Sequence, residues 1–405
     1  MKQPTRIKEH KLHALCPYYA MFPPGFARES ILTYTRQGDI VLDPFSGRGT
    51  TALEALLNGR RAIGLDVNPV AALVSQAKVQ TPTLKTILKR LNELETEYKA
   101  SGKRSIYKTL KTLPIFFQYA YAESTLQQIL FLRSNLRWNN SKTDRFICSL
   151  ILGHLHGESN ATPSYLSNQM PHTIAPKQNY AIRFWLRHKY QAPVRDAFEL
   201  LRRKAKFRLQ DGIPKGQGHI KCADARQAYK RFRTFKGQVS ALITSPPYLN
   251  ATNFEEDQWL RLWFLGGDPK PTYCHYSKDD RHLNKDKYFA FLGAVWKGVR
   301  PLMKQSSVLV CRIGTRYMSY EEMIQRLSET ILETWPHSVL VGQPAITELK
   351  NSQTEIFQPG ADGCKQEYDF VFRLAEKSHV ATATFQKPHK NRLNIRHSNM
   401  NIAYS

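Results

Sequence analysis

Residues 39–66 read DIVLDPFSGRGTTALEALLNGRRAIGLD. Two short apolar runs, at 39–43 and 62–66, each end in an aspartate and enclose a helical segment at 50–58 that stops at Gly59. A strand, a helix and a second strand in this order form the repeating unit of a doubly wound sheet, in which ligands bind at the carboxyl ends of the strands. We therefore expect an α/β fold with a mostly parallel, Rossmann-like sheet.

The turn between the first strand and the helix, at 44–49, contains two glycines that let the backbone pass close to a ligand. The hexapeptide that begins at Gly47 also fits the G-x-G-x-x-G/A fingerprint, so the turn predicts an adenosine-containing cofactor without choosing among such cofactors. Asp66 follows 19 residues after Gly47 and is suited to accept hydrogen bonds from ribose hydroxyls. Thr50 and Thr51 are suited to capping the helix. No Gly-Lys-Ser/Thr follows, which excludes a phosphate-binding P-loop.

The segment VSALITSPPY at 239–248 is an apolar, β-branched run with an abrupt stop. Pro246 and Pro247 fix their own φ and carry no N–H, so the chain leaves the strand without joining a helix or a ladder. The hydroxyl of Ser245, the carbonyl of Pro246 and the ring of Tyr248 then lie at the carboxyl end of the strand. This corner suits a planar ring with an amino group, because the ring stacks on the tyrosine and both amino hydrogens find acceptors. The alternative is a strand terminator with a packed tyrosine.

The charge of the chain is its most unusual bulk property. In 405 residues there are 59 Lys and Arg against 33 Asp and Glu, a formal net charge of +26. This excess favours nucleic acid as the partner, with an anionic membrane surface as the weaker alternative. No apolar run approaches the roughly 18 residues that span a bilayer, no signal peptide is visible, and none of the six cysteines belongs to a Cys-x-x-Cys pair. We expect a cytoplasmic protein that associates with nucleic acid.

Much of the charge lies in residues 80–220, which hold 23 Lys and Arg against nine Asp and Glu and have helical apolar spacing. We interpret them as a helical insertion that binds nucleic acid. Cations interleaved with aromatic residues between Arg183 and Arg208 are typical of a nucleic-acid surface. A solvated helix bundle, whose charges only keep the protein soluble, is the alternative. The cations that we expect to contact phosphates are Arg202, Arg203, Lys204 and Lys206.

Three smaller features complete the pattern. His154 and His156, followed by Glu158, have the residue types of a metal site, but no further ligand lies nearby, so we favour a structural role and expect no metal. A third strand is predicted to end at Asp224, which is suited to accept a hydrogen bond from an adenine amino group. The aromatic and proline-rich segment at 10–24 either lines a ligand or packs as an amino-terminal arm.

In this order the segments resemble the S-adenosylmethionine-dependent amino-methyltransferases of DNA, which modify cytosine N4 or adenine N6. The resemblance covers about 1–80 and 220–375 and leaves the insertion unmatched. Four segments carry it: the Phe-x-Gly-x-Gly turn at 43–49, the ribose-binding strand end at 64–69, the Ser-Pro-Pro-Tyr motif at 244–248, and the segment at 10–24, which is similar to the piece that closes over the methionine part of the cofactor.

The resemblance implies a class I methyltransferase fold, S-adenosylmethionine as cofactor, and a flipped or single-stranded base as substrate. It implies a catalytic domain made of 1–79 and 221–375, an insertion at 80–220 that recognises the target, and a flexible basic tail at 376–405. The catalytic residues that it implies are Ser245, Pro246, Pro247 and Tyr248. The cofactor-binding residues that we expect are Phe22, Pro23, Asp43, Phe45, Gly47, Gly49, Asp66 and Asp224.

The base and the substrate class have alternatives. Ser-Pro-Pro-Tyr is commoner among cytosine-N4 enzymes and Asp-Pro-Pro-Tyr among adenine-N6 enzymes, so we favour cytosine N4 and keep adenine N6 as the alternative. An RNA-base or protein-glutamine methyltransferase and a non-catalytic nucleic-acid-binding homologue are further interpretations. The basic insertion argues against a protein substrate, and the intact glycines, Asp66 and Tyr248 argue against loss of catalysis. A restriction-modification system would add a cognate restriction endonuclease as a partner.

Overall fold

The structure is a computed structural model of the chain. It describes residues 9–18, 22–157, 163–168, 177–249, 257–271, 284–314, 318–348, 364 and 366–375. The tail predicted at 376–405 and Glu158 of the histidine motif lie outside the described residues.

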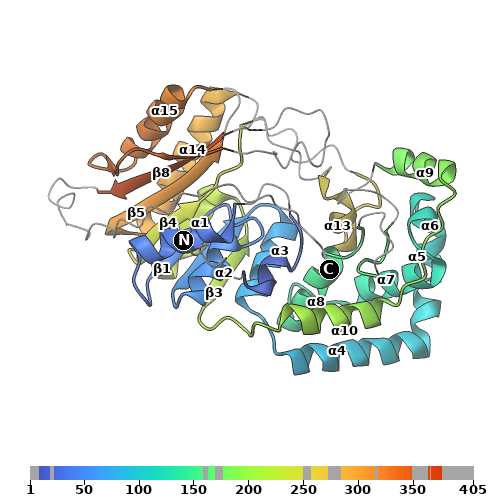
Figure 1. Cartoon of the computed structure of the whole chain (residues 1–405). Coiled ribbons are helices and arrows are strands. Elements are labelled where there is room, and N and C mark those ends of the chain that lie inside the picture. The colour runs from blue at the N-terminus through green and yellow to red at the C-terminus, as the bar shows by residue number, and fades with distance from the viewer. Residues whose placement is uncertain are drawn as a thin grey trace, which may run out of the picture.

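A single sheet organises the described chain, with strand order β3-β2-β1-β4-β5-β8-β6 and β7 pairing with β8 (Figure 1). The first five strands in this order are parallel, whereas β8 runs antiparallel to β5, β6 and β7. The order reverses between β1 and β4, which is the switch point where doubly wound sheets bind ligands. The bounds are β1 Ile40–Asp43, β2 Arg61–Asp66, β3 Gly218–Cys222, β4 Val239–Thr244, β5 Met303–Gly314, β6 Val339–Leu340, β7 Ala345–Glu348 and β8 Gln366–Leu374.

Alternate residues of the central strands face two different helical layers. Val41 of β1 belongs to the hydrophobic core between the sheet and helices α1 and α2. Its neighbour Leu42 belongs to the core on the opposite face, between the sheet and helices α14 and α15. This alternation follows from the period of two in a strand and produces the doubly wound architecture that the sequence predicts. The helices on the first side are α1 Pro24–Tyr34, α2 Thr50–Leu57 and α3 Pro69–Val79; those on the second are α11 Ala228–Arg231, α14 Lys285–Val299 and α15 Tyr320–Leu332.

Between α3 and β3 the described chain is helical, as the apolar spacing predicts. These helices gather to one side of the sheet in Figure 1. They share one hydrophobic core with α3 and with α13, Trp259–Phe264, which follows the Pro-Pro-Tyr segment. We propose that this helical unit is the second domain of the chain. Its helices are α4 Leu84–Glu97, α5 Lys103–Thr112, α6 Phe116–Ala120, α7 Glu123–Asn135, α8 Lys142–Leu152, α9 Gln178–Arg187 and α10 Ala197–Arg208, with a π-helical turn at Tyr98–Gly102 between α4 and α5.

The start of α2 differs from the sequence expectation. Its N-cap is Gly49, with φ of 79°, and no threonine side chain caps it. A Cβ at Gly49 would lie 2.7 Å from Ser75 Oγ, so both the left-handed conformation and the close approach of α3 require glycine here. Thr51 instead donates a hydrogen bond to the carbonyl of Ile243 at 3.4 Å, which ties α2 to β4.

Both histidines of the candidate metal motif are buried. Burial lowers the pKa of His154 and of His156 to about 3, so both are neutral at physiological pH. His154 Nδ1 lies 2.6 Å from the carbonyl of Leu150, one turn earlier in α8.

Within the described ranges, no helix has the length and apolar content to cross a bilayer.

We predict that Gly64→Ala destabilises the sheet by about 1–3 kcal/mol, the usual cost of overpacking a core. A Cβ at this β2 position would lie 2.2 Å from Ser46 Oγ and 2.9 Å from the carbonyl of Asp43. Gly293→Ala in α14 is the matched control, because its nearest neighbour would be Thr330 Cβ at 3.9 Å. The control should be neutral or gain up to about 1 kcal/mol, since alanine favours a helix. Urea unfolding of both variants measures the difference, and equal stabilities would contradict the packing argument.

Candidate active site

The carboxyl ends of β1 and β4 are joined by a buried hydrogen bond. Thr244 Oγ1 donates to Asp43 Oδ1 at 2.6 Å, and the backbone N–H of Phe45 donates to the same oxygen at 3.0 Å. Burial raises the pKa of Asp43 to about 6, although these hydrogen bonds oppose the shift. The second oxygen, Oδ2, is buried and has no hydrogen-bond partner among the described residues. Such an acceptor suits a positively charged or N–H donor of a ligand.

Asp66, at the end of β2, is fixed by the turns on either side of it. Its Oδ2 accepts from the backbone N–H of Gly47 at 2.8 Å and its Oδ1 from that of Asn68 at 2.9 Å. Burial raises its pKa to about 7, and the two hydrogen bonds oppose this. Each carboxylate oxygen keeps a second lone pair, so the group is able to accept hydroxyl donors as well. The glycine turn and the acid that the sequence predicts as a cofactor site are therefore in direct contact.

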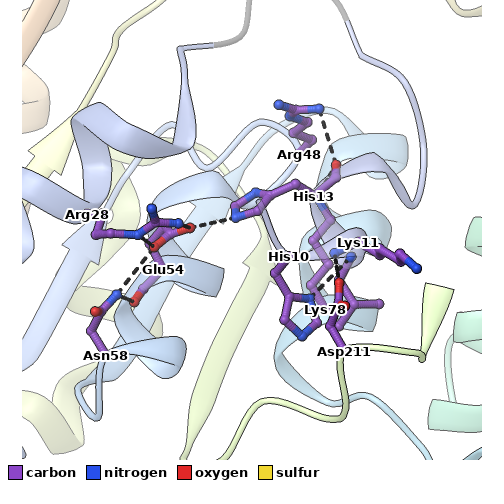
Figure 2. A network of polar contacts seen from close by, with 10 residues as sticks. His10, Lys11, His13, Arg28, Arg48, Glu54, Asn58, Lys78 and Asp211 are labelled. Carbon is purple, nitrogen blue, oxygen red and sulfur yellow. Dashed lines mark hydrogen bonds and ion pairs between the residues drawn. The ribbon is translucent and has the colours of Figure 1, made fainter. Parts of the chain in front are cut away.

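The amino-terminal segment is fastened beside this turn by a buried polar network (Figure 2). Glu54 of α2 accepts from Arg28 at 3.0 Å and lies 2.7 Å from Nε2 of His13. Burial lowers the pKa of His13 to about 4. The carbonyl of His13 accepts from Arg48 and from the fully buried Lys78, both at 3.2 Å. These contacts hold the short helix Lys11–Ala14 against α2 and α3.

After this helix, the segment reaches the carboxyl end of β2 at Tyr18. The hydroxyl of Tyr18 accepts from Asn68 Nδ2 at 2.8 Å, next to Asp66. Phe22 packs edge to face against Phe26 of α1, with ring centroids 5.3 Å apart, and Pro23 is the exposed N-cap of α1. Both expected cofactor-binding residues of this segment thus lie at the start of α1, and their contact with the cofactor stays a prediction.

Ser245 to Tyr248 leave β4 as a turn without regular structure, as the two prolines predict. Pro246 is buried, whereas Ser245 and Tyr248 are partly exposed. The Tyr248 hydroxyl donates to Glu367 Oε1 of β8 at 2.7 Å. Burial and the charge of Glu367 raise the pKa of Tyr248 well above its ordinary value, while a hydrogen bond with Ser245 lowers it. The tyrosine is therefore a neutral ring held at one end.

The residues that hold this tyrosine were not predicted from the sequence. Arg312 of β5 forms a two-pronged ion pair with Asp369, at 2.6 and 2.7 Å, and its Nη1 lies 3.6 Å from Glu367. The guanidinium also sits 4.0 Å from the ring centroid of Phe26. Tyr248 is thereby linked through Glu367 and Arg312 to the helix that follows the amino-terminal segment. The sequence signals for this cluster were one arginine, Arg312, within an apolar strand and two acids, Glu367 and Asp369, at alternate positions of another strand.

Two other expected cofactor residues have partners within the protein. Both oxygens of Asp224 accept hydrogen bonds from Arg226, at 3.0 and 2.7 Å. An adenine amino group that donates to Asp224 would therefore bind an oxygen that already accepts from Arg226. Phe45 packs edge to face against Phe291 of α14, with centroids 5.8 Å apart.

The four cations of α10 do not form one free surface. Arg202 pairs with Glu95 and bonds Asn92, both on α4, and Arg203 donates to the carbonyl of Pro163. Burial, with repulsion from Arg208 and Arg203, lowers the pKa of Lys204 to about 8, and the side chain lines a narrow pocket between α10 and α8. Lys206 is exposed. The phosphate contacts predicted from this run therefore have competing partners at two of the four positions, Arg202 and Arg203, and Lys204 is partly buried.

Comparison with known proteins gives a family match for the amino-terminal part of the chain. Residues 2–77, which include β1, the glycine turn, α2 and Asp66, match a family model described as a DNA methylase of the N6/N4 type. This part of the chain therefore resembles the DNA amino-methyltransferases.

Individual relatives match shorter or longer parts of the chain. It is similar to the orphan methyltransferase M.BamHII of Bacillus amyloliquefaciens, with 49% identity over 49 residues, 12% of this chain and 18% of the relative. It is similar to the type II methyltransferase M.MjaII of Methanocaldococcus jannaschii, with 29% identity over 92 residues, 23% of this chain and 17% of the relative. Similarity to M.BsoBI of Geobacillus stearothermophilus is 26% over 277 residues, 62% of this chain and 52% of the relative. The matches thus span about half or less of these relatives.

S-adenosylmethionine is the cofactor of this family, and the site has the groups to hold it. Gly47, whose N–H donates to Asp66, has no side chain to fill the space beside this carboxylate, which is suited to the ribose hydroxyls. The orphaned Oδ2 of Asp43 is suited to accept from the ammonium group of the amino-acid part. Phe45 and the segment through Phe22 offer apolar surface.

We predict that cofactor affinity falls as the pH is lowered through about 7. Hydrogen bonds from ribose hydroxyls favour the ionised form of Asp66, whose pKa in the free protein is raised to about 7. Protonation therefore opposes binding below that pH, by up to about tenfold per pH unit. Calorimetry with S-adenosylmethionine between pH 6 and 8.5 measures the effect.

Asp66→Asn should bind more weakly and lose this part of the pH dependence, because an amide does not titrate. Asp224→Asn is the matched control and should keep the wild-type pH profile. Identical profiles for wild type and Asp66→Asn would mean that the ribose is held by other groups.

Proposed function

We propose that the chain is a DNA methyltransferase that transfers a methyl group to the exocyclic amino group of a base, with cytosine N4 as the favoured target. The observation that carries this proposal is the Ser-Pro-Pro-Tyr turn at the end of β4, beside the Asp43–Thr244 hydrogen bond at the switch point of the sheet. The pairing supports the proposal, because the end of β4 lies next to the end of β1, from which the glycine turn starts.

The residues of the turn act on the amino group of the base. When bound, S-adenosylmethionine supplies an electrophilic methyl group on a positively charged sulfur. The exocyclic amine is a poor nucleophile because its lone pair is delocalised into the ring. Ser245 and the carbonyl of Pro246 accept its two hydrogens, which favours a pyramidal nitrogen with a localised lone pair. The contribution of the protein is thus positioning and electrostatics, and the proton leaves after transfer without a strong general base.

Tyr248 holds the ring of the base by stacking. Its hydroxyl bond to Glu367 and the Arg312–Asp369 pair behind it restrain the ring, so less conformational freedom is lost when the base arrives. A paired base does not reach this corner, so the substrate is flipped out or single-stranded, at a cost of a few kcal/mol.

Adenine N6 is the second candidate target. The Ser-Pro-Pro-Tyr sequence favours cytosine, whereas one relative with 44% identity over 46 residues is the DNA adenine methyltransferase YhdJ of Escherichia coli. DNA as the substrate is supported by the family and by the net charge of +26. A cognate restriction endonuclease is a partner only if the chain belongs to a restriction-modification system, as the names of several type II relatives suggest.

Expression in a host without other methylases, followed by digestion of its DNA to nucleosides and mass spectrometry, tests this function. We expect N4-methylcytosine. N6-methyladenine would move the target to the second candidate, and unmodified DNA from cells with folded protein would contradict the proposal.

We predict that Tyr248→Ala slows methyl transfer by at least about a hundredfold and leaves cofactor affinity near normal, because the ring contacts the base and not the cofactor. Tyr248→Phe keeps the ring and removes only the bond to Glu367, so its rate should fall about tenfold or less, an effect of one hydrogen bond. Single-turnover rates on a labelled oligonucleotide separate the two. An equal decrease in both variants would assign the function to the hydroxyl, and wild-type rates in Tyr248→Ala would reduce the residue to packing.

A further inference from the structure

Helix α9 and the residues on either side of it form an exposed basic and aromatic surface. Residues 177–195 contain five Lys and Arg and no Asp or Glu. The side chains of Ala181 and Trp185 point into the helical core, where Trp185 packs on Phe116 with centroids 5.4 Å apart. This inward packing fixes the opposite face of the helix toward solvent. The exposed cations on it are Lys177, Arg183, Arg187 and Lys189.

Aromatic rings run between these cations. Tyr180 stacks on Phe184, with centroids 6.2 Å apart, and His188 stacks on Tyr190 at 5.7 Å. Phe184 and His188, one helical turn apart, join the two pairs with centroids 4.4 Å apart. Tyr180 and Tyr190 are 56% and 43% exposed, so large ring faces remain in contact with water. Exposed aromatics in a row are uncommon on a surface without a partner.

The cations of this surface differ from those of α10 in their partners. Within the described chain, the side chains of these four cations form no ion pair. The one hydrogen bond from their side chains joins Arg183 to the carbonyl of Asn179 in its own helix. Arg202 and Arg203 of α10 are bonded to other segments instead. Cations without ion-pair partners are able to replace counterions around a polyanion without first breaking an ion pair.

The surface is connected to the segment that follows the proposed catalytic turn. Gln178 Nε2, at the start of α9, donates to the carbonyl of Pro269 at 2.7 Å. Pro269 lies just after α13, whose Trp263 carbonyl accepts from Arg133 of α7 at 2.8 Å. An open hollow of about 490 Å³ is lined by residues 112–114, before α6, and by residues 268–270, after α13. A ligand bound to α9 would therefore have a defined position with respect to α13, because the two helices belong to one packed unit.

We propose that this α9 surface, rather than α10, is the main DNA-binding surface of the helical unit, with phosphates at its cations and bases stacked on Tyr180 and Tyr190. The inference rests on the proposed function for its partner. The positive charge of the α9 surface favours a polyanion as its partner. The exposed rings favour a polyanion whose flat bases stack on them, and this describes a nucleic acid.

Fluorescence anisotropy with labelled oligonucleotides tests the surface through the salt dependence of binding. The triple variant Arg183→Gln, Arg187→Gln and Lys189→Gln should lower the slope of log affinity against log salt by about 0.9 for each phosphate that the variant no longer neutralises on duplex DNA. The matched triple, Arg203→Gln, Lys204→Gln and Lys206→Gln on α10, should change the slope by less than the value of one phosphate. Circular dichroism and thermal unfolding confirm that both variants are folded.

The aromatic part has its own test. Tyr180→Ala with Tyr190→Ala should weaken binding of single-stranded DNA about tenfold at high salt, where stacking persists and charge attraction is screened. A flattened slope in the α10 triple with a wild-type slope in the α9 triple overturns the proposal. If wild type binds and methylates DNA and the α9 variants behave like it, only this inference fails. If wild type shows no salt-dependent DNA binding, the inference and the proposed function fail together.

Discussion

The hydrogen bond between Thr244 and Asp43 is the constraint on which the rest of the site depends. It joins the carboxyl ends of β1 and β4, the two strands between which the sheet changes direction. A buried carboxylate with one oxygen satisfied by this hydroxyl and one left without a described partner is energetically unfavourable in the free protein. That cost is the kind expected where a ligand completes the set of hydrogen bonds, so the instability of this carboxylate and its affinity for a ligand have one origin.

Around this bond, two restrained units converge. On the cofactor side, Glu54 and Lys78 hold the amino-terminal segment through His13. On the base side, Arg312 and Glu367 hold Tyr248. Phe26 belongs to both, because it follows the amino-terminal segment and lies over the guanidinium of Arg312. Helix α1 carries both Phe26 and Arg28, the partner of Glu54, so this one helix contacts the residues of both proposed halves of the site.

The sequence was sufficient to predict those parts of the fold that depend on residues close together in the chain. The strand, glycine turn, helix and Asp66 were predictable because their pattern fits within 28 residues, and the proline pair ended β4 as expected. The helix cap was mispredicted, because the close approach of Ser75 that requires Gly49 is tertiary. The partners of Tyr248 were not predictable, since Glu367 lies 119 residues further along the chain. Similarly, the charge of α10 is visible in the sequence, whereas Glu95, 107 residues before Arg202, comes to lie opposite it only when α4 and α10 pack.

The shared core of α13 and the inserted helices has an evolutionary consequence. Trp263 packs against Phe117 with centroids 4.4 Å apart, and Trp259 packs against Phe116 at 5.2 Å, although α13 and α6 are separated by β3 and β4 in the chain. An exchange of residues 80–208 alone between two such proteins would leave both tryptophans facing a foreign core. Recombination that preserves folding therefore has to carry two separate stretches of gene together, which favours gradual divergence of this region over its wholesale replacement.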